Sequence, residues 1–189
     1  MTRLTVGVAT LFLVLAGCGG DGDDTGTSSA ATEWADSVCQ AADDVSSSLS
    51  GLTDALDVDT GSSASEAMDQ VQSELSDRAD DVQQSVRDLS DAITELPTDA
   101  DSAINSAEED LSSDAEALNS SVEGLSGALS KAADAGDAEE FTTALTESST
   151  ELAATQDALA TLADDIEGYA QSSEEAVRQA FEDAPSCQA

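Results

Sequence analysis

The sequence has no histidine and few aromatic residues, with one Trp, one Tyr and three Phe among 189 residues. Without histidine, neither a Ser-His nor a Cys-His nucleophile can be assembled. A glycosidase-like carboxylate pair would need a cleft lined by aromatic or similar binding groups, and the chain offers few of them. Neither a phosphate loop nor a dinucleotide-binding fingerprint occurs. We therefore expect a protein that is not an enzyme, with no catalytic residue and no cofactor.

Basic residues are also scarce, with five Lys and Arg against 41 Asp and Glu, for a formal charge of −36. Nucleic-acid binding requires a basic surface, so this class of partner is excluded. An anionic lipid surface would repel the chain as well. The negative charge is compatible with a cationic partner, and equally with the alternative that the acidity only keeps the protein soluble.

One acidic segment resembles a calcium-binding loop. Asp57, Asp59 and Gly61 alternate with other residues, and Glu66 follows. An EF-hand loop needs a ligand where Gly61 stands and a glycine at the next position. We therefore expect no metal site here.

The apolar residues recur at steps of three and four in four successive runs, the pattern of one face of a helix. No run alternates at period two, so strands find no support. The pattern predicts helices over residues 33–57, 65–96, 99–134 and 138–183, with Thr32 capping the first and Thr98 or Asp99 the third. The runs extend from Trp34 to Leu56, from Met68 to Leu96, from Ile104 to Leu129 and from Phe141 to Phe181.

Short connections between these helices favour antiparallel neighbours. The sequence therefore predicts an all-α protein, an elongated antiparallel four-helix bundle with coiled-coil-like packing and a thin core of Leu, Val and Ala. The fourth helix is the longest, and part of it is expected to lack a partner. Because the last two stripes keep heptad spacing, an intermolecular coiled coil competes with the isolated bundle, and the chain is either a monomer or a coiled-coil oligomer.

The N-terminus reads as an export signal. A basic start, Met1-Thr2-Arg3, precedes an apolar run of about twelve residues, shorter than the roughly 20 that span a membrane. Leu15-Ala16-Gly17-Cys18 then resembles the lipobox of bacterial lipoproteins. That resemblance implies cleavage before Cys18, a diacylglycerol thioether on its sulfur and a further acyl chain, such as palmitate, on the new amino group. An uncleaved anchor and a soluble export signal are the alternatives.

Three segments follow from this reading. Residues 1–17 are the signal peptide, 18–31 a lipidated flexible tether rich in Gly, Ser and Asp, and 32–189 the acidic helical domain. Multiple acyl chains suffice for stable anchoring. We expect the protein on the extracytoplasmic face of the cell membrane, held there through Cys18.

With Cys18 committed to lipid, Cys39 and Cys187 remain in an oxidising compartment. Cys39 lies early in the first predicted helix and Cys187 follows the last one. An antiparallel four-helix bundle brings these two ends together, so we expect one disulfide to close it. A redox or metal pair is the alternative, but the chain has neither a CxxC spacing nor histidine. Trp34 is in register with Val38 and Val45, which favours core packing over a contact surface.

The ends of the domain carry a further resemblance. Glu33-Trp34-Ala35-Asp36-Ser37-Val38-Cys39 opens it, and Phe181-Glu182-Asp183-Ala184-Pro185-Ser186-Cys187 closes it. These segments resemble a group of actinobacterial helical lipoproteins and secreted proteins that begin with Trp-Ala-x-x-Val/Ile-Cys and end near Ser-Cys. The resemblance implies export and a disulfide, but no activity. The expected function is that of an envelope-anchored lipoprotein with a non-enzymatic helical binding or structural domain. A self-associating coiled-coil assembly protein of the cell surface is the alternative.

Overall fold

The computed structural model describes residues 29–56, 64–98 and 100–188. Outside the gaps at 57–63 and 99, this part of the chain is helical and has no strand, which confirms the all-α prediction. Four long helices and two short ones follow in order: α1 (Ser29–Leu56), α2 (Ala64–Thr94), α3 (Ser102–Ala133), α4 (Ala138–Ala170), α5 (Glu175–Asp183) and the 3-10 helix η1 (Pro185–Gln188).

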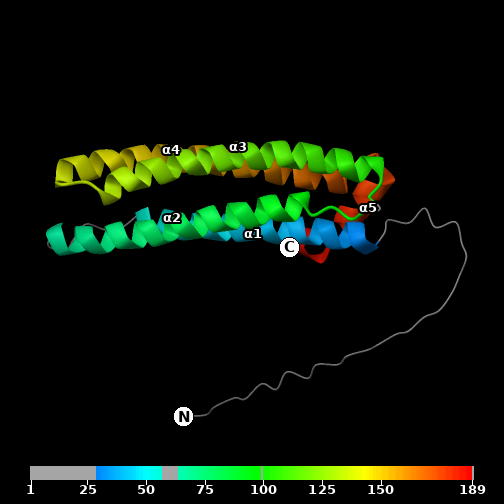
Figure 1. The fold of residues 1–189 in the computed structure, drawn as a ribbon, viewed down its shortest axis with the longest axis horizontal. Coiled ribbons are helices and arrows are strands. Elements are labelled where there is room, and N and C mark those ends of the chain that lie inside the picture. The colour runs from blue at the N-terminus through cyan, green and yellow to red at the C-terminus, as the bar shows by residue number, and fades with distance from the viewer. Residues whose placement is uncertain (1–28, 57–63, 99, 189) are drawn as a thin grey trace, which may run out of the picture.

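The four long helices form the predicted elongated antiparallel bundle. Figure 1 shows the α3–α4 pair lying along the α1–α2 pair, with α5 across one end. Each long helix packs extensively on the next one in the chain, whereas α1 and α4, which close the ring, touch far less. None of the described helices is long and apolar enough to cross a membrane.

The core is the apolar stripe read from the sequence. Branched residues spaced seven apart are almost fully buried in each of the first three helices: Val38, Val45 and Leu52; Leu75, Val82 and Leu89; Ile104, Leu111, Leu118 and Leu125. In α4 the stripe contains two small hydroxyl residues, Ser148 and Thr155, which are also fully buried. Their hydroxyls donate to Ala144 O and Glu151 O, each at 2.9 Å, so neither donor is left unpaired.

The helix starts differ from two expectations. Thr32 lies inside α1, because Ala31 is already buried in the core and gives the first turn a packing partner. Residues 29–31 are therefore helix, not tether. The cap of α3 is Asp101, two or three residues after the expected positions, and its Oδ1 accepts hydrogen bonds from Ala103 N at 2.8 Å and Ile104 N at 3.0 Å.

The prediction of one continuous helix over 138–183 is wrong. The chain leaves α4 at Ala170, turns through residues 171–174 and enters α5, which crosses the end of the bundle (Figure 1). A straight helix would have carried Val177 and Phe181 past its neighbours into water. The turn buries both of them against α1, α3 and α4, so burial decides the break where periodicity could not.

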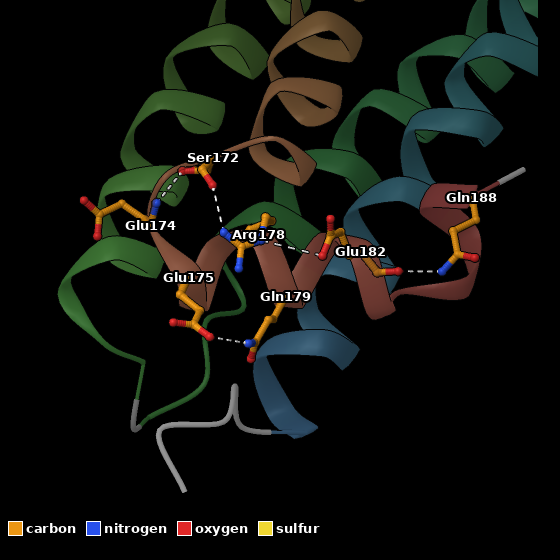
Figure 2. Close-up of polar contacts among 7 residues, drawn as sticks. All are labelled: Ser172, Glu174, Glu175, Arg178, Gln179, Glu182 and Gln188. Carbon is orange, nitrogen blue, oxygen red and sulfur yellow. Dashed lines mark hydrogen bonds and ion pairs between the residues drawn. The ribbon is translucent and has the colours of Figure 1, made fainter.

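Local contacts hold this turn and the helix after it (Figure 2). Ser172 Oγ accepts a hydrogen bond from Glu174 N at 3.1 Å, and Ser172 O accepts one from Arg178 Nη1 at 3.5 Å. Arg178 also pairs with Glu182 at 3.7 Å, and Gln188 Nε2 donates to Glu182 O at 2.6 Å. The last residues are thereby folded back onto α5.

One disulfide closes the bundle, as predicted. Cys39 and Cys187 are bonded across a sequence separation of 148 residues, with Cα atoms 5.2 Å apart. Beside the bond, Ser186 N donates to Asp36 Oδ1 at 2.7 Å. The bond and the hydrogen bond together fix η1 to the first turns of α1.

Reduction of the Cys39–Cys187 disulfide should lower the free energy of unfolding by up to about 5 kcal/mol, because the bond constrains a long loop in the unfolded chain. Urea unfolding of residues 29–189, followed by circular dichroism with and without reductant, measures this change. The Cys39→Ser/Cys187→Ser variant is the control, since reductant should not alter it. Equal midpoints for the oxidised and reduced protein would contradict a stabilising role.

Candidate functional site

Two of the three residues singled out from the sequence meet in the structure. Cys39 and Cys187 form the disulfide. Cys18, the expected lipid-attachment residue, lies outside the described residues, and so does most of the calcium-like segment (Asp57, Asp59 and Gly61). The described chain therefore tests the closing bond but not the anchor.

Three aromatic residues gather beside the disulfide, where α1, α4 and α5 meet. The Phe181 ring stacks on Tyr169 with centroids 5.4 Å apart and meets Trp34 edge-on at 5.6 Å. Trp34 is only 4 % exposed, and its Nε1 donates to Ile93 O in the last turn of α2 at 3.0 Å. This hydrogen bond pairs a carbonyl that α2 cannot satisfy itself. Trp34 is thus a core residue that joins α2 and α5 to α1, as its register predicted.

Next to this cluster, three carboxyl groups face one another across α3 and α4. Asp110 and Asp114 lie one turn apart on α3, and Asp165 lies on α4 one turn before Tyr169. Tyr169 Oη lies 3.5 Å from Asp110 Oδ2, to which it can donate, and 3.5 Å from Ala107 O. Burial, followed by the charge of Asp110, raises the pKa of Tyr169, so this phenol keeps its proton.

Asp114 is the perturbed member of the group. Burial raises its pKa from 3.8 to about 6, helped by a hydrogen bond with Asp165 and by the charges of Asp165 and Asp110. Among the described residues, its buried Oδ2 atom has no hydrogen-bond donor. Two ionised carboxylates cannot hydrogen-bond to each other, so the hydrogen bond with Asp165 exists only when one of the two holds a proton. The unpaired Oδ2 atom describes the pair with both carboxyl groups ionised, and the hydrogen bond describes the pair with one of them protonated.

With a pKa of about 6, Asp114 exchanges its proton in mild acid. Its Oδ2 atom is buried, whereas the residue as a whole is partly exposed and Asp110 and Asp165 are exposed. The i,i+4 spacing of Asp110 and Asp114 is visible in the sequence. Their pairing with Asp165 depends on the register between α3 and α4, which no sequence motif reports.

A wide hollow of about 750 Å³ lies at the opposite end of the bundle, at the α3–α4 turn. Its polar groups already serve the fold. Asp137 Oδ1 accepts from Glu139 N and Glu140 N to cap α4, and Lys131 pairs with Glu147 at 2.7 Å. Since these groups are engaged and exposed, the hollow carries no specific chemistry.

A second concave region follows the loosely packed side of the bundle, where α1 faces α4. Two adjoining hollows, of about 360 and 460 Å³, share Ala42, Asp43 and Ala163 and run from Gln156 to the disulfide. We call this region the α1–α4 groove. The sequence did not reveal it, because Leu159 and Ile166 belong to the apolar stripe of the fourth run and were expected to be covered by neighbouring helices.

Asp114→Asn should raise the Tm at pH 7 and weaken its dependence on pH. Folded Asp114 binds its proton more tightly than the unfolded residue, so native stability falls as the pH rises from about 4 to about 6 and does not fall further above that window. Glu116→Gln, which removes an exposed carboxylate from the same helix, is the matched control. Thermal unfolding at pH 4, 5, 6 and 7 measures the effect, and the same pH profile in both variants would contradict it.

The described residues hold no group of three or more Asp, Glu or Cys side chains suited to a metal ion. Comparison with models of protein families, with curated proteins and with solved structures gives no match for this chain. The sequence motifs of the chain and the geometry of its described residues are therefore the basis for proposing a function.

Proposed function

We propose that this protein is a lipoprotein held on the extracytoplasmic face of the cell membrane, where its helical bundle acts as a non-enzymatic binding or structural module. The observation that carries the proposal is Leu15-Ala16-Gly17-Cys18, which directly follows an apolar run. The disulfide between Cys39 and Cys187 supports export, because such bonds persist in oxidising compartments. Residues 19–28 separate Cys18 from α1 and would tether the bundle to the membrane.

The chemistry of the bundle supports a role without catalysis. Among the described residues, the carboxyl group with a clearly raised pKa, Asp114, lies beside other carboxyl groups, and the polar groups of the hollow at the α3–α4 turn cap α4 and pair with one another. The acidic surface favours cationic or protein partners in the envelope and disfavours nucleic acid.

The alternative, self-association through a coiled coil, has less support. The heptad-spaced stripes of α3 and α4 that suggested it are buried on other helices of the same chain: Leu118, Leu125, Leu152 and Leu162 are each at most 6 % exposed. A second copy is not needed to cover them, and two chains of this charge repel each other.

Cys18→Ala should abolish lipid attachment and remove the mature protein from the membrane, either by release or by stalling it as the uncleaved precursor. Membrane fractionation combined with intact mass measurement tests this outcome. Ser28→Ala, in the same segment, is the control and should leave both lipid and location unchanged. A Cys18→Ala protein that is still membrane-bound and cleaved at the same place would overturn the anchoring proposal.

Residues 29–189 should sediment as a monomer at micromolar concentration, because most residues of the apolar stripes are buried within one chain. Sedimentation velocity in low and moderate salt measures the oligomeric state and separates it from charge repulsion. A defined oligomer in both salts would favour the coiled-coil assembly instead.

A further inference from the structure

The floor of the α1–α4 groove combines apolar residues with serines, Ser46 and Ser50 towards one end and Ser186 at the other. Larger side chains that remain half-buried line it, notably Leu159 and Ile166, together with the exposed Ala163. Alanines at positions 42, 160 and 170 keep the floor low, since their side chains end at Cβ. An apolar surface of another molecule could therefore displace water from this floor with little rearrangement of the groove.

The groove lies where α1 and α4, two of the long helices, touch far less than consecutive long helices do. Helix α4 packs closely on α3 and only sparsely on α1, so the seam between α1 and α4 is not filled by their own side chains. Gln156 Nε2 reaches Thr53 Oγ1 at 3.4 Å near one end of the groove, and the disulfide joins η1 to α1 at the other. The hollow part of the seam thus lies between the Gln156–Thr53 hydrogen bond, which joins α4 to α1, and η1.

The face that contains the groove carries charge of one sign. Helix α1 has five acidic residues and no basic one, and α4 has eight acidic residues and no basic one. Asp43 and Glu167 stand at the groove itself. The basic residues of the described chain lie on α2, α3 and α5 (Arg78, Arg87, Lys131 and Arg178). Lys131 pairs with Glu147 of α4, and the Arg78 guanidinium lies beside Gly51 of α1, but neither side chain lines the groove.

We propose that the α1–α4 groove is a docking surface for a basic amphipathic helix of another protein. A largely apolar floor between two parallel walls is the surface on which the apolar face of a helix lies, and an acidic rim complements Lys or Arg on its flanks. Residues 156–170 of α4 extend for about 21 Å, which matches three to four turns of a bound helix. The inference rests on the proposed binding role and adds the surface and the class of partner.

Charge decides against two other occupants. A second copy of this chain would bring its own acidic face to an acidic groove. A free fatty acid would place its carboxylate beside Asp43 or Glu167, where like charges repel. The negative potential that repels a second copy of the chain and a fatty acid attracts a basic helix.

The test uses the full chain in zwitterionic lipid nanodiscs, with empty nanodiscs as the blank. The probe is a fluorescent Leu/Lys peptide of about fourteen residues, whose leucines recur at steps of three and four along one helix face. Ala163→Lys places a charged side chain in the floor of the groove and should weaken binding of the peptide about tenfold or more, which is the effect expected at the centre of an interface. Ala154→Lys makes the same change at an exposed position of α4 outside the groove and should have little effect.

A second pair of variants tests the rim. Asp43→Asn/Glu167→Gln should weaken binding roughly fivefold, since surface charge pairs contribute modestly. Asp44→Asn/Asp157→Asn removes two exposed charges from the same helices outside the groove and should weaken binding less. A scrambled peptide of the same composition should bind far more weakly than the amphipathic one.

Equal loss in Ala163→Lys and Ala154→Lys, or equal binding of the scrambled peptide, would overturn the inference, because either would show attraction to net charge alone. Preferential binding of a fluorescent fatty acid, or a dimer that Ala163→Lys dissociates, would assign the groove to another occupant and also overturn it. The peptide assay applies equally to protein recovered without lipid. The peptide assay therefore distinguishes a failure of the docking proposal from a failure of the anchoring proposal.

Discussion

The Cys39–Cys187 disulfide joins the two ends of a chain that has little else to hold them together. Its formal charge of −36 favours expansion, and its core consists largely of Leu, Val and Ala, with buried Ser148 and Thr155 in α4. Around the bond, Asp36 accepts a hydrogen bond from Ser186 N, and Phe181 packs between Trp34 and Tyr169. Covalent closure, the aromatic cluster and the reversal into α5 form one structural unit at this end of the bundle.

The same end of the bundle contains a group of carboxyl groups whose mutual repulsion destabilises the fold. Asp114 keeps an oxygen away from water beside Asp110 and Asp165, and its pKa is raised to about 6 as a result. Protonation relieves this repulsion, so Asp114 contributes more to the stability of the folded state below about pH 4 than above about pH 6.

The side of the bundle where α1 faces α4 is packed less fully, and its hollows extend to the disulfide. Where α1 meets α4, the side chains do not fill the seam, and a largely apolar floor remains under an acidic rim. The bundle has other hollows, at the α3–α4 turn and between α2 and α3, and the α1–α4 groove combines half-buried Leu159 and Ile166 with acidic residues beside them. This combination is the basis for the proposed docking of a basic helix.

The sequence by itself determined the helical class, the antiparallel order, the core stripe and the pairing of Cys39 with Cys187. These features follow from the periodicity of the apolar residues, from the short connections between helices and from the two cysteines other than Cys18. Each of these can be read directly from the sequence. It did not determine the break at 171–174, because the stripe continues through Phe181 and only burial at the end of the bundle favours a turn. Nor did it reveal the Asp114–Asp165 pair or the α1–α4 groove. Both depend on the register and separation of helices distant in sequence, and tertiary packing alone decides these.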